Sequence, residues 1–237
     1  MKTGPATGLL WVAVAAAAVG YLSYQRLAAP RSGLTQIPGA TSASQPASDA
    51  GSAPADVPPE APSTAIPEEV PDLTLVDLAG KRHALRDAGG HARLFNFWAT
   101  WCEPCLREIP LLNTLQRDHA AEGLQVVGIA VDMRDAVQKF LRTTPMRYTL
   151  LVGEDDGLEA AQKFGMALAL PFSVFADEHN RIIAVKLGEL HREEAATILA
   201  NMRALRAGTT TLAAAREDIA RELKAMAIDR AKQSSRN

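Results

Sequence analysis

The sequence has few of the residues that mark several common classes of protein. It contains only two cysteines and five histidines in 237 residues, and its formal net charge is −2. Two cysteines exclude a secreted scaffold held by several disulfides. The sequence also lacks a basic block and zinc-finger spacing, which excludes the usual nucleic-acid-binding classes. Because no internal repeat is evident, a solenoid is excluded as well.

Both cysteines lie in one short stretch, FWATWCEPCLREIP, at residues 97–110. A Cys-x-x-Cys pair can supply half of a zinc site, close a structural disulfide or work as a redox pair. Zinc needs two further ligands, and the five histidines are scattered, so we expect no metal. Closing so short a loop removes little entropy from the unfolded chain, which disfavours a purely structural disulfide. The pattern therefore favours a redox pair.

The N-terminal quarter differs in composition from the remainder of the chain. Residues 8–25 carry no charge and are long enough to cross a bilayer, which predicts a membrane anchor after a cytoplasmic N-terminus at residues 1–7. A cleavable signal peptide ending near residue 29 is the alternative. Residues 26–70 contain no aromatic residue and hold eight of the fourteen prolines. Such a segment cannot bury enough apolar surface to fold, so we expect a disordered linker.

Residues 71–206 alternate between strand and helix patterns. This alternation predicts an α/β domain with parallel crossovers, and a closing hairpin makes its sheet mixed. The residues after 207 form a C-terminal helical extension, whose apolar stripe fits either a solvated helix or a partner-binding helix. The predicted strands span 73–77, 82–86, 93–98, 124–131, 148–152, 171–175 and 181–187. The predicted helices span 103–119, 135–141, 157–164, 193–205 and 212–228.

The strand at 93–98 runs directly into the cysteines, which places Cys102 at the start of a helix. Unpaired backbone N–H groups and the helix dipole at that position favour a thiolate over a thiol. Because the thiolate is the nucleophile, we expect Cys102 to attack a substrate. Cys105 lies one turn deeper and resolves the mixed disulfide. Pro104 suits the first helical turn, where no N–H bond is lost.

The stretch FWATWCEPCLREIP resembles the active-site segment of the thioredoxin-like family. More narrowly, it is similar to the TlpA/ResA-like membrane-anchored thiol–disulfide oxidoreductases, over roughly residues 71–206. The resemblance implies a thioredoxin-like mixed sheet flanked by helices and a redox-active disulfide between Cys102 and Cys105. It implies no cofactor, and it places Pro110 inside the helix that follows the cysteines.

The resemblance also implies a cis-proline loop facing the cysteines, for which Leu170-Pro171 is the candidate. Cis peptide bonds are almost confined to X–Pro. A cis turn there would place the Leu170 backbone where it binds an extended substrate, while a trans proline starting an edge strand is the alternative. We expect Trp101 to border the sulfurs as a second substrate contact, and Trp98 to lie in the core.

Two glutamates near the cysteines are candidates for control of the chemistry. Classical thioredoxins carry a buried aspartate at the position of Asn96, so that acid is absent from this chain. TlpA/ResA-like proteins resemble one another in having a glutamate three residues after the second cysteine, and Glu108 stands at that position. A partly buried Glu108 would accept the Cys105 proton, although most helix glutamates are simply solvated. Glu103 adds negative charge beside Cys102, which raises the thiol pKa and disfavours the reduced form. Both acids therefore favour the prediction of a reductase.

The predicted function is reduction of protein disulfides in the periplasm, with the domain held at the inner membrane. The resemblance implies apocytochrome c or copper-delivery proteins as substrates and a membrane thiol-shuttling protein as reductant. A disulfide oxidase or isomerase is an alternative, and a peroxiredoxin-type peroxidase is less favoured because its nucleophile lacks a resolving cysteine two residues on. A binding module that carries a static disulfide, such as a metal chaperone, is the alternative outside enzymes.

Overall fold

The fold is described for residues 65–87, 89–166 and 169–235 of a computed structural model of the chain. The predicted anchor at residues 8–25, the preceding residues and nearly all of the predicted linker lie outside these ranges. Among the residues described, no helix has both the length and the apolar character that crossing a bilayer requires.

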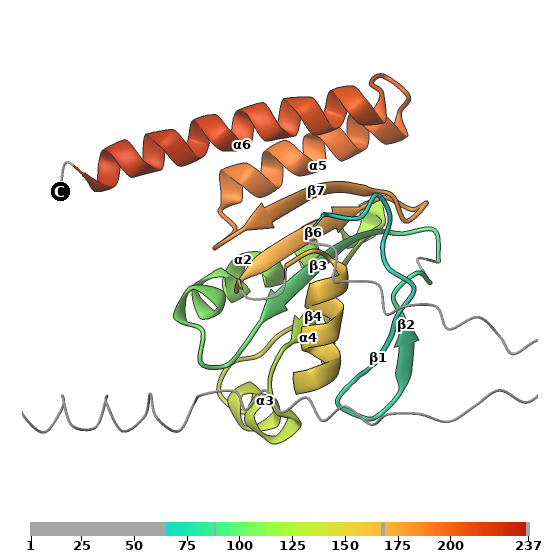
Figure 1. Cartoon of the computed structure of the whole chain (residues 1–237), viewed down its shortest axis with the longest axis vertical. Coiled ribbons are helices and arrows are strands. Elements are labelled where there is room, and N and C mark those ends of the chain that lie inside the picture. The colour runs from blue at the N-terminus through green and yellow to red at the C-terminus, as the bar shows by residue number, and fades with distance from the viewer. Residues whose placement is uncertain (1–64, 88, 167–168, 236–237) are drawn as a thin grey trace, which may run out of the picture. The chain divides into compact units, whose positions relative to one another are not determined.

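A five-stranded mixed sheet, in the order β5-β4-β3-β6-β7, forms the centre of the domain, and a two-stranded hairpin, β1-β2, forms a second sheet (Figure 1). β3 pairs in parallel with β4, and β4 with β5, whereas β6 is antiparallel to both β3 and β7. This arrangement confirms the predicted mixed sheet and its closing hairpin. The strands are β1 (Thr74–Val76), β2 (Arg82–Ala84), β3 (Ala92–Trp98), β4 (Leu124–Ala130), β5 (Thr149–Val152), β6 (Phe172–Ala176) and β7 (Ile182–Leu187).

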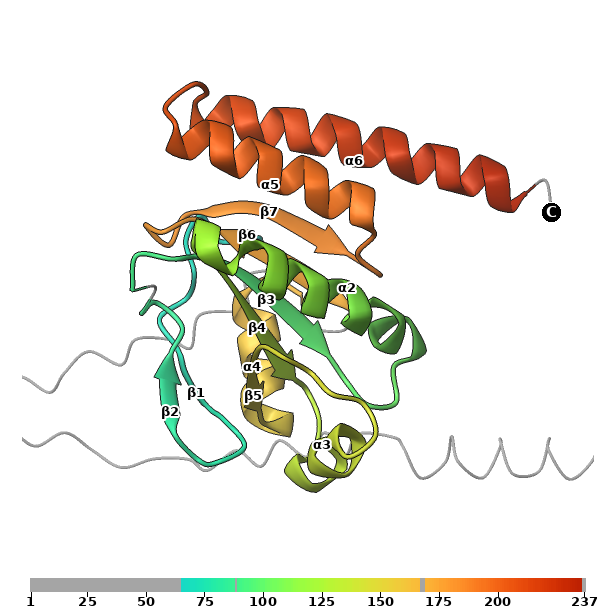
Figure 2. The same ribbon diagram turned by 180° about the vertical axis from the view of Figure 1, so that it is seen from behind.

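Helices cover both faces of the sheet and produce two apolar cores. α2 and α5 pack on one face, and α4 packs on the other together with the β1–β2 hairpin (Figures 1 and 2). α6 lies outermost, against α5 and the edge strand β7. The helices are α2 (Glu103–His119), the 3-10 turn η1 (Ala120–Glu122), α3 (Arg134–Leu141), α4 (Glu154–Lys163), α5 (Arg192–Arg206) and α6 (Leu212–Ser234).

The packed domain begins a few residues before the boundary predicted at residue 71. Val70 is fully buried, and its N–H donates to Asn180 O at 2.8 Å. The N–H of Ile182 in turn donates to Glu68 O at 2.9 Å. The end of the proline-rich segment thus pairs with the outer edge of β7, a long-range contact that composition does not reveal.

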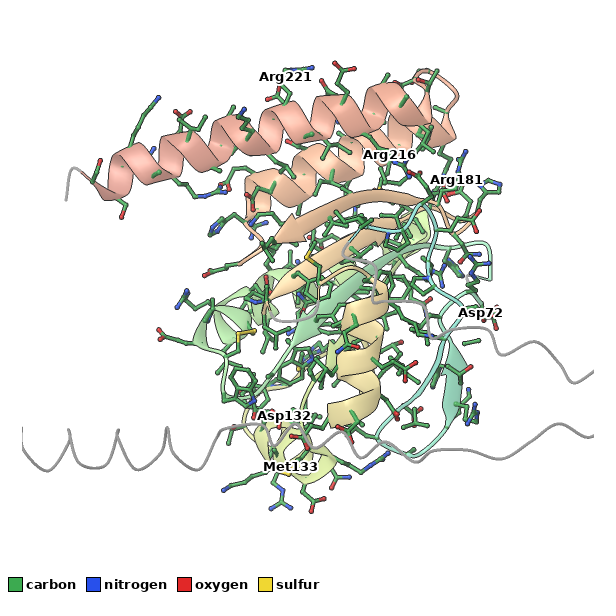
Figure 3. The ribbon with its side chains drawn as sticks, in the orientation of Figure 1. Asp72, Asp132, Met133, Arg181, Arg216 and Arg221 are labelled. Atoms are coloured by element: carbon green, nitrogen blue, oxygen red, sulfur yellow. A yellow bond between two sulfur atoms is a disulfide. The ribbon has the colours of Figure 1, made fainter. Side chains whose placement is uncertain are left out.

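The helix predicted after residue 207 is α6, and its first half is firmly packed. Ala215 and Ile219 are buried, and the Nε of Arg216 donates to Ile182 O at 2.9 Å. Figure 3 places Arg216 beside the start of β7, close to Arg181, whereas Arg221 points away from the domain. The alternative of a solvated helix is therefore wrong for this half.

β3 is buried along all seven residues because strands flank it on both sides. In this register Asn96 lies between Gly128 of β4 and Ser173 of β6. A Cβ at Gly128 would lie 3.0 Å from Cε2 of Tyr148 and 3.3 Å from Nε1 of Trp98. The glycine thus leaves space for two large rings on the face of the sheet that α2 covers.

Candidate active site

The two cysteines lie where β3 passes into α2, as the sequence predicts. β3 ends at Trp98, Cys102 is the N-cap residue of α2, and a disulfide joins Cys102 to Cys105. Pro104 occupies the first turn, and α2 continues through Pro110. A strand followed at once by a helix start therefore fixes both sulfurs at one edge of the sheet.

The two cysteines differ in their access to solvent. Cys102 is 6% exposed and Cys105 is 1% exposed. The position of Cys102 at the helix N-terminus places it beside unpaired N–H groups that stabilise a thiolate. This arrangement supports the assignment of Cys102 as nucleophile and Cys105 as resolving cysteine.

A buried aspartate holds the turn that precedes Cys102. Oδ2 of Asp132 accepts the backbone N–H of Thr100 at 2.9 Å and its hydroxyl at 2.6 Å, and Oδ1 accepts the N–H of Met133 at 2.8 Å. Asp132 lies two residues before α3 (Figure 3). Asp132 was not predicted as a site residue, because its contact joins residues 32 apart in the chain.

The predicted cis-proline loop lies beside the disulfide. The peptide bond between Leu170 and Pro171 is cis, which confirms the prediction. Leu170 packs against the apolar cluster that contains Cys102 and Cys105. Because proline has no N–H, Pro171 adds no backbone donor to this loop.

An open apolar hollow of about 320 Å³ adjoins this loop. Trp101, on its rim, is 71% exposed, whereas Trp98 is fully buried in the core, as predicted. An exposed indole beside a disulfide provides a large apolar contact area at low cost in conformational entropy. The hollow is lined by Trp101, Val131, Leu158, Ala161, Met166, Ala169 and Leu170.

Glu108 is buried beneath the disulfide, so the alternative of a solvated helix glutamate is wrong. Its side chain accepts a hydrogen bond from Nδ2 of Asn96 at 2.7 Å and another from the N–H of Leu190 at 2.7 Å. Cys105 and Glu108 are three residues apart on α2 and are both 1% exposed, so they share the inward face of the helix. The asparagine that replaces the usual acid thus holds an acid supplied by the helix.

Burial raises the pKa of Glu108 to about 7, and the hydrogen bonds from Leu190 and Asn96 oppose part of this effect. Among more distant charges, Glu189 raises the pKa of Glu108 and Lys186 lowers it. A carboxyl with this pKa exchanges its proton near neutral pH, which is the property required of a base for a thiol.

Two further groups complete the surroundings of Glu108. Ser173 Oγ lies 3.1 Å from Nδ2 of Asn96 and occupies the second donor of that amide. Burial raises the pKa of Tyr148, and the negative charge of Glu108 adds to this effect. Glu108, Asn96, Ser173, the N–H of Leu190 and Tyr148 form what we call the inner polar cluster.

Glu103 lies outside this cluster, and its predicted effect on Cys102 is weakened. Its side chain is 87% exposed and forms an ion pair with Arg107 at 3.0 Å, and Arg107 also binds Glu189 at 2.8 Å. The guanidinium offsets the glutamate charge, and water screens what remains. The spacing of four residues between Glu103 and Arg107 was the signal in the sequence that could have revealed the pair.

A disulfide between a helix-capping cysteine and a buried cysteine one turn further on, beside a cis-proline loop on this sheet, defines a thioredoxin-like protein that exchanges thiols and disulfides. The AhpC/TSA family model matches residues 66–207, more than half of the chain, and the chain belongs to the AhpC/TSA family. It is accordingly a thiol–disulfide oxidoreductase, the activity that the names of its ResA relatives state.

The relatives include the thiol-disulfide oxidoreductase ResA of Bacillus thuringiensis subsp. konkukian, which is 31% identical over 130 residues, 54% of this chain and 73% of the relative. The thioredoxin-like protein YneN of Bacillus subtilis is 30% identical over 131 residues, 54% of this chain and 74% of the relative. Among solved structures, a Chlorobium tepidum protein described as a thiol:disulfide interchange protein DsbE superposes with a TM-score of 0.53 at 26% identity. It covers 60% of this chain and 99% of its own.

Proposed function

We propose that the protein is a reductase of protein disulfides and that Glu108 is the base of its second step. The observation that carries this proposal is the buried carboxyl with a pKa of about 7 on the same helix face as Cys105. A buried negative charge there disfavours a thiolate, so it disfavours the reduced form and helps the pair to release its electrons.

The reaction begins with both cysteines reduced. The Cys102 thiolate attacks one sulfur of a substrate disulfide, the substrate S–S bond breaks, and the released substrate thiolate takes a proton from water. Cys102 is then joined to the substrate in a mixed disulfide. The exposed ring of Trp101 and the hollow beside Leu170 hold apolar parts of the substrate during this step.

In the second step the Cys105 thiol gives its proton to Glu108, and the resulting thiolate attacks the sulfur of Cys102. The mixed disulfide breaks, the Cys102–Cys105 bond forms, and the second substrate sulfur leaves as a thiolate. Two electrons have then passed from the enzyme to the substrate. An external dithiol must return them before the next turnover, and we propose a membrane thiol-shuttling protein for this role.

Insulin reduction, combined with the reduction potential measured against glutathione, tests the direction of electron flow. We expect catalysed reduction of insulin and a low potential. A potential near that of strong periplasmic oxidants, together with faster oxidation of reduced ribonuclease than reduction of insulin, would instead identify an oxidase.

We further propose that residues 8–25 anchor the protein in the inner membrane with the domain in the periplasm. The uncharged N-terminal stretch supports the anchor, and the need for a dedicated reductant in an oxidising compartment supports the location. An alkaline phosphatase fusion after Gly51 should be active. Activity of a cytoplasmic reporter alone at that position would exclude this topology.

The proposed clients are apocytochrome c haem-binding cysteines or copper-delivery proteins. The support is the resemblance to TlpA/ResA-like proteins together with an apolar hollow that suits extended polypeptide. A Cys105→Ser variant keeps the mixed disulfide on Cys102, so proteins released from it by dithiothreitol identify the client. Recovery of neither class would contradict this proposal, and a Cys102→Ser, Cys105→Ser double variant provides the background.

A further inference from the structure

α6 lies beyond the family match, which ends at residue 207, yet one ion pair joins it to a buried carboxylate of α5 that neighbours the inner polar cluster. α5 and α6 lie side by side (Figures 1 and 2), and Nη2 of Arg230, near the C-terminal end of α6, binds Oε1 of Glu194 in the first turn of α5. The Glu194 side chain is 1% exposed, so its charge must be compensated within the protein.

Lys186 of β7 is shared between Glu194 and the turn that follows β7. Its Nζ lies 3.7 Å from Oε2 of Glu194 and donates to the carbonyls of Leu187 at 2.7 Å and Glu189 at 3.0 Å. Oε2 of Glu194 also accepts the N–H of His191 at 2.9 Å. The turn at residues 187–191 is therefore held at both ends by groups that converge on Glu194.

The same turn supplies a hydrogen bond to the proposed base. The N–H of Leu190 donates to Oε2 of Glu108, and Leu190 is 2% exposed. Its neighbour His191 is the residue whose N–H binds Glu194. Two consecutive backbone N–H groups thus bind two buried carboxylates, one on α2 and one on α5.

We propose that Arg230 is a positioning residue for Glu108: by compensating Glu194, it leaves Lys186 free to bind the carbonyls of the 187–191 turn and so keeps the Leu190 N–H on Glu108. The inference rests on the proposed role of Glu108 as the base. It gives the C-terminal helix a role in the reaction, although α6 lies on the far side of α5.

Removing the Arg230 guanidinium leaves Lys186 as the cation closest to a buried carboxylate. An unpaired buried charge costs several kcal/mol, so Lys186 moves toward Glu194 and gives up the two carbonyls. The turn then shifts, and Glu108 loses the Leu190 donor. Since that hydrogen bond favours the ionised carboxylate, its loss raises the pKa of Glu108.

Two charged groups near Glu108, Lys186 and Glu189, act on its pKa in opposite directions, so the lost Leu190 hydrogen bond decides the direction of the shift. Lys186, from β7, lowers the pKa of Glu108. Glu189, from the turn, raises it, and Tyr148, which precedes β5, is neutral at the pH values of interest because its own pKa is raised. The partners on β3 and β6, Asn96 and Ser173, do not titrate.

The test is the pH dependence of the second step in full-length protein. A mixed disulfide between Cys102 and 5-thio-2-nitrobenzoate reports, by absorbance, the rate at which Cys105 displaces the dye between pH 5 and 9. We expect Arg230→Gln to move the midpoint of this profile upward by about half a pH unit and to slow the reaction about threefold at low pH. Arg221→Gln is the matched control, because within the described part of the chain Arg221 pairs with Asp218 and Glu222 on its own helix, and it should leave the midpoint unchanged.

A second pair of variants separates this inference from the proposed function. Glu108→Gln should remove the midpoint near pH 7 from the pH profile of dye release, and a midpoint that persists in this variant would show that Glu108 is not the base. Where the midpoint is removed, the double variant Glu108→Gln, Arg230→Gln should react at the same rate as Glu108→Gln alone. An equal slowing by Arg230→Gln in both backgrounds, or an unchanged midpoint with a lowered melting temperature, would overturn the positioning role.

Arg230→Lys keeps the charge and provides the test if Arg230→Gln does not fold. A single ammonium replaces the forked guanidinium less well, so we expect an upward shift of the midpoint smaller than that of Arg230→Gln. A midpoint identical to that of the unmodified protein in a folded Arg230→Lys would also contradict the inference.

Discussion

The two sides of the disulfide have opposite chemical character. The outer side, formed by Trp101, Leu170 and the hollow between them, is apolar and open to solvent. The inner polar cluster around Glu108 is closed, and within it Glu108 is hydrogen-bonded to Asn96 and the Leu190 N–H, and Asn96 to Ser173. The difference indicates a division of work, in which the outer side binds substrate by its apolar surface and the inner side moves the proton of Cys105.

The cysteines themselves provide the sharpest test of this division, because they face different sides. Cys102→Ser should abolish turnover, since no other nucleophile contacts the substrate, whereas Cys105→Ser should still form the mixed disulfide and stop there. Non-reducing mass spectrometry after one addition of insulin distinguishes the two. Equal trapping by both variants would mean that either sulfur can attack, and the assigned order would be wrong.

Replacing the two glutamates of α2 in turn tests whether the inner side alone controls the proton. Glu108→Gln should slow the resolving step by about a hundredfold at pH 7, within the usual contribution of a positioned base. Glu103→Gln, the matched control on the same helix, should change it less than twofold because that charge is exposed and paired with Arg107. Stopped-flow measurement of dye release checks both, and similar rates for the two variants would contradict the comparison.

The burial of Glu108 also predicts how stability depends on pH. The pKa of its carboxyl is about 7 in the folded protein and near 4.5 in the unfolded chain, so folding favours the protonated form. The folded protein therefore loses stability as the pH rises between those values, by an amount on the order of 3 kcal/mol. Glu108→Gln should remove this loss and raise the melting temperature at pH 8 but not at pH 4.5. A gain of the same size at both values would show that the carboxyl is not the cause.

Trp101→Ala should have the smallest effect and should act on the outer side alone. We expect kcat/KM for insulin to fall about tenfold through loss of aromatic contact area, with no change in the midpoint of the pH profile. Ile228→Ala, which removes an exposed apolar side chain from α6, is the control and should leave kcat/KM unaltered. A shifted midpoint in Trp101→Ala would couple the two sides and weaken the comparison.

Local patterns predicted much of the fold and the outer part of the site. The buried strand, the Cys-x-x-Cys pair and the helix after it are contiguous, so their order alone placed Cys102 at a helix start. The cis peptide at Leu170 followed from family resemblance and agrees with the structure. Each of these features depends on residues that are adjacent in the chain or on a short motif that can be recognised in the sequence.

The surroundings of Glu108 could not be predicted in the same way. Leu190 lies 82 residues from Glu108, and its contribution is a backbone N–H that any residue except proline would offer. Arg230 and Glu194 are separated by 36 residues on helices whose packing sets the contact. The residue type of Glu108 therefore suggested a role in the reaction, but only the tertiary arrangement reveals the groups that form hydrogen bonds with its carboxyl.

The backbone N–H and carbonyl groups at the start of β7 lie on the outer edge of the sheet, and their hydrogen bonds have one more consequence. Edge strands with free N–H and C=O groups are templates on which another copy of the same chain can add a strand. At Ile182 the N–H is bound to Glu68 and the carbonyl to Arg216, so the start of this edge is already filled by the segment before the domain and by α6. The helix beyond the family match therefore also protects the sheet against edge-to-edge aggregation.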